Sequence, residues 1–343
     1  MLVENIQTLH SHTKNSDGEM SHMEILKTCE DNGITAIAFT DHDSVIDEKN
    51  LQVLQDYKGS VKWISGIEIS SGLPKELGGG ATSDLHITGL FVDPTNKKLI
   101  QHCILARKAR ETRMQKMVSN LTDLGFDITE EDCIKASGGE AVGRPHVVAA
   151  LVSKPKNNET LEQLRLKMQK EGEKDEEIQK RYNAMMEQGE RQYPYAILLS
   201  DDAYIPNIYV DYQYFLDLDA SVKLIRDAGG VALLAHYFSC ARKIDENMLD
   251  GMLEDDRLDG LETVYGLFCL NMGGDIERKV DDSLKVVREL VKKHDKPEGG
   301  GVDVHTLENI ENFVKSKGYS EKTVDMVEEI IKKSGVNTKW SNL

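Results

Sequence analysis

The stretch ITAIAFTDHD (residues 34–43) joins a run of apolar and β-branched residues to an imidazole that stands between two carboxylates. The run 34–40 predicts a buried strand, because a short apolar segment of this kind is typical of the core of a sheet. Ionisable groups directly after a buried strand are costly unless they are paired or bind a metal. We therefore interpret His42 as a metal ligand that the neighbouring carboxylates orient, with a hydrogen-bonded core histidine as the alternative.

Apolar runs next to an imidazole or a carboxylate recur along the chain. The further runs are 61–69 with Glu68, 85–92 with His86, and 231–235 with His236. Strands that each carry such a residue at one end are what a barrel enzyme needs to gather ligands around one point. Six of the ten histidines of the chain belong to motifs of this kind, which favours a metal centre over a set of unrelated core histidines.

Two short motifs near the ends of the chain have the spacing of paired ligands. Residues i and i+2 of a strand point to the same face, so His10 and His12 can bind one ion. Asp303 and His305 have the same spacing in the predicted strand 302–305. Asp17 lies in a Ser-Asp-Gly turn close behind the first motif, where the alternative is an ordinary turn aspartate.

The nine candidate ligands predict two or three divalent ions that share bridging groups. They are His10, His12, Asp17, His42, Glu68, His86, His236, Asp303 and His305. Imidazole and carboxylate ligands without a thiolate suit zinc, manganese or iron, and the sequence does not choose among these metals. Two ions about 3.5–4 Å apart would hold a bridging hydroxide and stabilise both oxygens of a displacement at phosphorus.

The order of predicted elements indicates an α/β fold with a helical insertion. The first hundred residues alternate strands (5–9, 34–40, 61–69, 85–92) with helices such as 21–32, which Ser21 and Glu24 cap. This alternation predicts a mainly parallel sheet with helices outside. The middle of the chain is charged and helical, and further strands follow at 231–235, 260–264 and 302–305. We expect residues 1–98 and 204–343 to form the metal-binding barrel, and residues 99–203 to form a helical insertion subdomain.

Composition restricts the partners of the protein. A net charge of −17 argues against binding long nucleic acid, which requires many basic contacts to phosphates. It does not exclude a small anionic substrate, because bound metal ions reverse the local field. The five cysteines are scattered and never spaced as CxxC, and neither a signal peptide nor an apolar run of membrane length is evident. These features predict a cytoplasmic protein with no membrane partner.

The segment Gly143-Arg144-Pro145-His146 supplies a different kind of group. The planar fork of Arg144 is suited to phosphate oxygens. The alternative is a helix start with proline in its first turn and an exposed arginine.

Taken in order, these motifs resemble the PHP (polymerase and histidinol phosphatase) family, specifically its small metal-dependent phosphoesterases. The matching segments are LHSHT (9–13), SDG (16–18), TDHD (40–43), GIEIS (66–70), LHITGL (85–90), GRPH (143–146), AGGVALLAH (228–236) and GVDVH (301–305). The resemblance implies a distorted seven-stranded (βα) barrel with two or three metals at the carboxyl ends of its strands. It also implies a helical subdomain that closes over the substrate.

The resemblance also implies a role for each matching residue. One metal site would contain His10, His12, Glu68 and Asp303; a second would contain Glu68, His86 and His236; a third would contain Asp17, His42 and His305. Arg144 and His146 match family positions that face the substrate phosphate, and we count both, with His305, as catalytic. The chain departs from the family in carrying Tyr237 where proline is usual, and Val302 and Thr306 where serine and glycine are usual.

These observations predict a metal-dependent phosphoesterase that hydrolyses a small phosphate monoester, a nucleotide, by a metal-bridging hydroxide. One alternative is a 5′ to 3′ exonuclease acting on short oligonucleotides. Another, from a different class, is a non-catalytic metal-binding regulatory scaffold, which would be expected to lack some ligands. The oligomeric state stays open.

Overall fold

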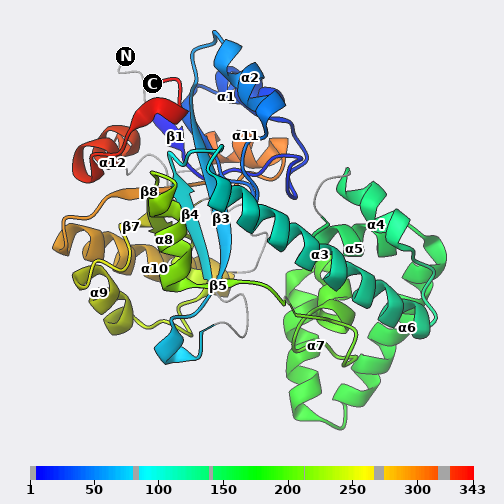
Figure 1. Cartoon of the computed structure of the whole chain (residues 1–343). Helices are drawn as coiled ribbons and strands as arrows, with labels where there is room; N and C mark the ends of the chain where they lie inside the picture. The colour runs from blue at the N-terminus through cyan, green and yellow to red at the C-terminus, as the bar shows by residue number, and fades with distance from the viewer. Residues whose placement is uncertain (1–4, 80–84, 139–141, 212, 266–273, 316–324) are drawn as a thin grey trace. The chain divides into compact units, whose positions relative to one another are not determined.

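The computed structural model describes the chain except residues 1–4, 80–84, 139–141, 212, 266–273 and 316–324 (Figure 1). Its contacts divide the chain into two compact units. We call the first the sheet unit; it comprises Met1–Ala106, Tyr214–Leu270 and Ile276–Leu343. We call the second the helical unit; it comprises Arg107–Gln213 and Asn271–Asp275.

The sheet unit contains one mixed sheet of eight strands in the order β1-β2-β3-β4-β6-β7-β8, with β5 paired to β3. The strands are β1 Ile6–Thr8, β2 Ile34–Phe39, β3 Lys62–Gly72, β4 Leu85–Leu90, β5 Leu216–Asp217, β6 Val231–Leu234, β7 Gly260–Tyr265 and β8 Glu298–Gly301. The predicted strands 34–40, 61–69, 85–92, 231–235 and 260–264 are therefore confirmed, with small shifts at their ends.

The prediction of a mainly parallel sheet holds for most pairs but is wrong for β4. This strand runs antiparallel to both of its neighbours, β3 and β6. The described part of the connection between β3 and β4 contains only a 3-10 turn, Lys75–Leu77, and no α-helix. A parallel pairing normally needs a helical crossover, so this connection favours a hairpin-like return.

The last predicted strand, 302–305, is also wrong in position. The chain pairs as β8 over Glu298–Gly301 instead, a segment whose three glycines gave no strand signal. Glycine is required there, because a Cβ on Gly301 would lie 2.2 Å from Oγ1 of Thr8. Asp303 has a φ of 57°, which ends the extended backbone, so Asp303 and His305 do not share a strand face.

The distorted seven-stranded barrel that the resemblance implies is not confirmed, because the sheet is not closed. No ladder joins β1 to β8 in the described residues; an isolated parallel bridge between Ser11 and Val304 connects the segments that follow them. Backbone hydrogen bonds support this bridge, with His12 N donating to Val304 O at 2.7 Å. The bridge brings the first and last candidate ligand motifs side by side.

Helices pack against the sheet and bury two apolar clusters. Helices of the sheet unit are α1 His22–Asp31, α2 Glu48–Asp56, α8 Leu218–Asp227, α9 Glu246–Glu254, α10 Gly274–Lys293 from Ile276 onward, α11 Leu307–Lys315 and α12 Met326–Ser334. One cluster contains Phe39 and Trp63, and the other contains Ile67 and Leu234. The capping box predicted for α1 is confirmed by the reciprocal hydrogen bonds of Ser21 and Glu24.

The helical unit has a core of its own, which includes Met114, Leu151 and Ile197. Its helices are α4 Glu130–Ser137, α5 Arg144–Val152, α6 Pro155–Gly172 and α7 Glu176–Gln188, with a π-helical turn at Tyr195–Leu199. Helix α3, Lys97–Asp123, begins in the sheet unit and continues into the helical unit. Among the described residues, no helix has both the length and the hydropathy needed to cross a membrane.

Gly18 offers a test of how the loop that carries Asp17 is built. A Cβ at this position would lie 2.2 Å from the backbone oxygen of His12. We expect Gly18→Ala to lower the free energy of unfolding by about 1–3 kcal/mol, because the backbone must shift to relieve the overlap. Urea unfolding would measure the change.

Gly251→Ala is the matched control, because a Cβ on Gly251 in α9 meets no atom within 4 Å. Alanine in an open helical position should be neutral or stabilising by about 0.5–1 kcal/mol. Equal effects of the two substitutions would contradict the close packing of the loop.

Candidate metal centre

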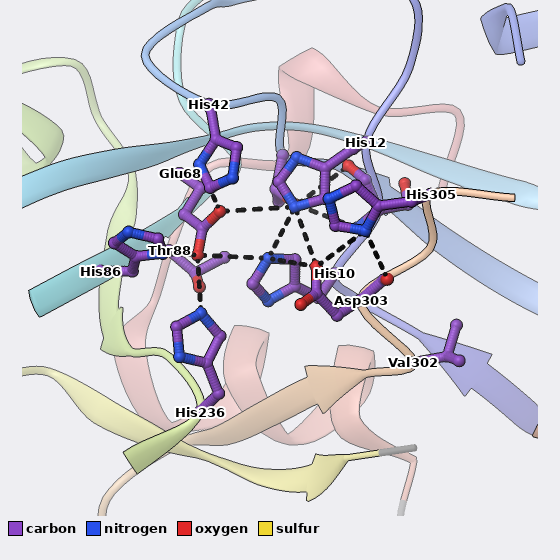
Figure 2. Close-up of polar contacts among 12 residues, drawn as sticks. His10, His12, His42, Glu68, His86, Thr88, His236, Val302, Asp303 and His305 are labelled. Carbon is purple, nitrogen blue, oxygen red and sulfur yellow. Dashed lines mark hydrogen bonds and ion pairs between the residues drawn. The ribbon is translucent and has the colours of Figure 1, made fainter. Parts of the chain in front are cut away.

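The nine candidate ligands converge at one end of the sheet, and Figure 2 labels all of them except Asp17. They come from the segments that follow β1, β2, β6 and β8, from the loop before α1, and from β3 and β4 themselves. Glu68 lies inside β3 rather than at its end. Because β4 is antiparallel, its second residue, His86, pairs in register with Ser70, beside the carboxyl end of β3. The strand reversal that the sequence did not predict therefore places His86 in the centre.

Three overlapping groups of ligand atoms have the spacing that a metal ion requires. Within each group all ligand atoms lie within 4.8 Å of one another. The groups are His12, Asp17, His42 and His305; His10, His12 and Asp303; and His42, Glu68 and His86. His12 and His42 each belong to two groups, so the grouping differs in detail from the three sites that the resemblance implies.

Glu68 lies at the middle of the arrangement. Its Oε2 is 2.8 Å from Nδ1 of His42, and its Oε1 is 2.9 Å from Nδ1 of His86 and 3.0 Å from Nε2 of His236. Nε2 of His10 and Nε2 of His12 each lie 3.4 Å from this carboxylate. The structure therefore brings five imidazoles to one fully buried glutamate.

Burial and neighbouring imidazoles have opposite effects on the pKa of each of the three carboxylates. Burial alone would raise the pKa of Glu68, but the imidazoles of His42 and His86 hold that pKa well below its ordinary value. His42 and His305 likewise hold the pKa of Asp17 well below its usual range against the effect of burial. His10 and His305 do the same for the pKa of Asp303. The centre therefore keeps three ionised carboxylates at neutral pH.

The direction in which the pKa of each imidazole shifts depends on the charges of its neighbours. Burial lowers the pKa of His12, and the adjacent His305 and His42 lower it further. Burial also acts to lower the pKa of His305, but Asp17 and Asp303 raise it to about 10. A cluster in which the pKa values of neighbouring imidazoles are shifted in opposite directions is typical of a functional site.

The residues present fit a divalent metal. Asp17 Oδ1, Glu68 Oε2 and Asp303 Oδ1 are buried, and among the described residues none of these oxygens accepts a hydrogen bond of normal geometry. Such oxygens are costly to bury unless a cation compensates them. Mixed nitrogen and oxygen donors without sulfur are the ligands that zinc, manganese and iron share.

Glu262 supports the centre and was not singled out from the sequence. It is buried in β7; its Oε1 accepts hydrogen bonds from Nδ1 of His10 and Oγ1 of Thr88, both at 2.7 Å. Its Oε2 accepts from the backbone N of His236 at 3.0 Å. A carboxylate that accepts from Nδ1 fixes the tautomer, so Nε2 of His10 faces Glu68. A charge inside the apolar strand 260–264 was the available signal.

The two carboxylates beside His42 hold the surrounding backbone. Asp41 accepts hydrogen bonds from N and Oγ1 of Thr13 and from Oγ of Ser16, at 2.7–2.8 Å. Asp43 accepts from the backbone N of Ser70 at 2.9 Å. These contacts connect the two carboxylates to the loop 13–16 and to β3, and their role in orienting His42 stays a prediction.

Arg144 and His146 lie in the first turn of α5, in the helical unit. His146 Nδ1 accepts a hydrogen bond from the backbone N of Gly143 at 2.9 Å, which caps the helix. The guanidinium of Arg144 is half-buried and lies 5.2 Å from the ring centre of Tyr195. The helix start with proline is thus confirmed, while the role of both residues toward a phosphate stays a prediction.

Tyr237, which stands where the family usually has proline, points into the core. Its side chain is buried, and its hydroxyl donates to the carbonyl of Ile244 at 2.9 Å. This departure therefore adds a core contact and leaves His236 beside Glu68.

The family model of the PHP domain matches residues 8–221. This span contains six of the nine candidate ligands; His236, Asp303 and His305 lie beyond it. The chain belongs to the PHP domain family. A protein of Eggerthella lenta named phosphoribosyl 1,2-cyclic phosphate 1,2-diphosphodiesterase is 26% identical over 151 residues, 44% of this chain and 55% of that protein. A 5′-3′ exoribonuclease of Haemophilus influenzae is 28% identical over 144 residues, 42% of this chain and 49% of that protein. The PHP chain thus spans about half the length of these relatives.

Two solved structures share the fold of this PHP protein. A candidate metal-dependent phosphoesterase of Bifidobacterium adolescentis has a TM-score of 0.63 and 21% identity, with 96% of each chain covered. An amidohydrolase of Chromobacterium violaceum with bound sulfate has a TM-score of 0.58 and 19% identity, covering 88% of this chain and 87% of that one.

Substitution of Glu262 tests its support of the centre. We expect Glu262→Gln to weaken divalent metal binding by about 10–100-fold, because the amide cannot accept all three hydrogen bonds and loses the charge that orients His10. Titration with manganese or zinc against a chelating dye would measure the affinity.

Glu298→Gln in the adjacent strand β8 is the control, because Oε2 of Glu298 accepts from Oγ1 of Thr263 and Glu298 is not a candidate ligand. Equal affinities for both variants would show that Glu262 does not support the metal.

Proposed function

We propose that this PHP protein is a metal-dependent phosphoesterase that hydrolyses a small phosphorylated substrate. The observation that carries the proposal is the ionised, fully buried carboxylate of Glu68 among five imidazoles. Membership of the PHP family and the phosphodiester chemistry in the names of two relatives support it. All nine candidate ligands are present, which disfavours the non-catalytic scaffold.

The proposed metal ligands combine the three groups of the centre with the sites that the family resemblance implies, which add His236. His10, His12 and Asp303 would hold one ion. Glu68 would hold a second with His86 and His236, while His42 lies close enough to share it. Asp17, His42 and His305 would hold a third. Zinc, manganese and iron all suit these donors.

Divalent ions bound here would supply Lewis acidity and lower the pKa of water for attack on phosphorus. The chain's own residues determine where the reacting group can approach. His86 and His305 retain 30% and 32% of their side-chain exposure, whereas the side chains of His10 and His12 are fully enclosed. A phosphoryl group would therefore approach from the side of His86 and His305, and the catalytic role of His305 would be to hold an ion on the face that the substrate reaches.

We propose a phosphate monoester, specifically a nucleotide, as the substrate. Arg144 and His146 would hold its phosphoryl oxygens, since a guanidinium and an imidazole both donate hydrogen bonds to phosphate. The net charge of −17 favours a small ligand with few phosphates over a long polyanion.

A second candidate is a 5′ to 3′ exonuclease on short oligonucleotides. The relative from Haemophilus influenzae that is named 5′-3′ exoribonuclease favours it. A short strand requires few basic contacts, so the acidic composition does not exclude this activity.

Removal of His12 tests the proposed metal-dependent hydrolysis. This residue belongs to two of the three ligand groups, so His12→Ala takes a ligand from both. We expect phosphate release from the metal-loaded protein to fall about 100-fold or more, together with the bound metal, since loss of a supporting residue alone costs about 10–100-fold. Elemental analysis and a phosphate-release assay would measure the two effects.

His294→Ala is the control, because His294 is paired with Asp250 away from the candidate ligands. If His12→Ala and His294→Ala released phosphate at the wild-type rate, the proposed centre would not be catalytic.

Product analysis separates the two candidate activities. A monoesterase should release inorganic phosphate from nucleoside mono- and bisphosphates and leave a 5′-phosphorylated short RNA at full length. An exonuclease should release mononucleotides from the 5′ end of that RNA in sequence. Chromatography of both reactions, each with and without a chelator, would show which activity depends on metal.

A further inference from the structure

A buried histidine outside the nine candidate ligands links the metal centre to other parts of the chain. His102 lies on α3 and is 3% exposed. Its Nε2 is 3.3 Å from Oδ1 of Asp43, and its Nδ1 is 3.1 Å from the hydroxyl of Tyr214. Neither His102 nor Tyr214 belongs to a motif that the sequence singled out.

The chemistry of the partners gives these contacts a direction. An ionised carboxylate only accepts hydrogen bonds, so Nε2 of His102 carries the proton that points to Asp43. In the tautomer with its proton on Nε2, Nδ1 is an acceptor, and the hydroxyl of Tyr214 donates to it. The same Oδ1 of Asp43 accepts from the backbone N of Ser70 at 2.9 Å. Tyr214, His102 and Asp43 thus form a directed chain that ends on β3.

Asp43 occupies a strained position next to a candidate ligand. Its φ of 46° lies in the left-handed region, which a non-glycine residue adopts only when its surroundings hold it there. Its backbone N donates to the carbonyl of Glu68 at 2.8 Å, and the backbone N of Glu68 donates to the carbonyl of Asp41 at 3.1 Å. His42 therefore stands between two backbone bonds to Glu68, and its Nδ1 is 2.8 Å from Oε2 of the same residue.

His102 and Tyr214 lie close to the two points where the chain changes units. Helix α3 passes from the sheet unit to the helical unit after Ala106, and the chain returns to the sheet unit at Tyr214. The hydrogen bond between His102 and Tyr214 therefore joins the segment that leaves the sheet unit to the segment that re-enters it. Through His102, both segments are also linked to Asp43, the residue that follows His42.

We propose that His102 and Tyr214 are positioning residues that hold His42 in its metal-binding orientation through Asp43. This inference rests on the proposed metal centre. It assigns to the first turns of α3 and to the segment at Tyr214 an influence on metal affinity, although neither contributes a ligand.

Cobalt binding to the full-length protein tests the proposal, because the visible spectrum of cobalt(II) reports ligand geometry as well as affinity. We expect His102→Ala to weaken cobalt binding by about 10–100-fold and to change the absorption bands. His102→Gln should restore part of the affinity, since its amide N–H can donate to Asp43. Tyr214→Phe, which removes one oxygen, should show the same spectral change to a smaller extent.

Tyr237→Phe is the matched control. Like Tyr214→Phe, it removes one phenol hydroxyl from the sheet unit, and Tyr237 adjoins a candidate ligand, His236. Its hydroxyl, however, donates to Ile244 and not to the chain of contacts at Asp43. We expect its cobalt affinity and spectrum to equal those of the wild type. Thermal unfolding of every variant shows whether it is folded. If His102→Ala does not fold, the cobalt spectrum of Tyr214→Phe decides whether these residues position His42.

Two unfavourable results are distinguishable. If folded Tyr214→Phe and His102→Ala bind cobalt with wild-type affinity and spectrum while His42→Ala does not, the positioning role is wrong and the metal centre stands. If the wild type and His42→Ala both fail to bind cobalt, zinc and manganese, the proposed function fails, and this inference fails with it.

Discussion

The buried carboxylate of Glu68 is the constraint on which the rest of the sheet unit depends. An ionised glutamate with 1% of its side chain exposed requires compensation from every direction. That compensation comes from segments after β1, β2 and β6 and from β4 itself, so the ends of these strands must meet at one point. The sheet order satisfies this requirement even without a closed barrel, because the bridge between Ser11 and Val304 brings its two edges together.

The same constraint explains where the backbone is strained. Asp43, His236 and Asp303 all have positive φ and all lie at the centre. Each such residue costs about 1–3 kcal/mol, and it persists only where its surroundings determine its conformation. Here those surroundings are polar: Ser70 N donates to Asp43, His236 N donates to Glu262, and Tyr265 donates to Asp303 at 3.2 Å. The hydrogen bonds that support the candidate ligands therefore also stabilise the turns that present them.

The extent to which this centre was predictable differs from residue to residue. His42 and His236 were recognisable because an apolar run ends one or two residues before each, and that pattern is local. The antiparallel direction of β4 was not recognisable from the sequence, because hydrophobic periodicity indicates which residues are buried and not how a strand is oriented. Strand β8 was missed because its glycines are chosen for close backbone approach rather than for β-propensity. His102 looks like any core histidine of an amphipathic helix, because its partners lie 59 and 112 residues away in the sequence.

Charge explains why the proposed substrate and the acidic composition are compatible. The centre contains three candidate carboxylate ligands, Asp17, Glu68 and Asp303, with Glu262 directly behind them. Imidazoles are neutral when they bind a metal, so the four carboxylates would give the ligand set a formal charge of −4, which by itself repels a phosphate. Two divalent ions would only balance those four negative charges, whereas three would leave the centre with a net charge of about +2, because bound cations dominate the local field. On the proposed function, the number of ions bound therefore decides whether this acidic protein attracts its anionic substrate, and the three overlapping ligand groups favour the larger number.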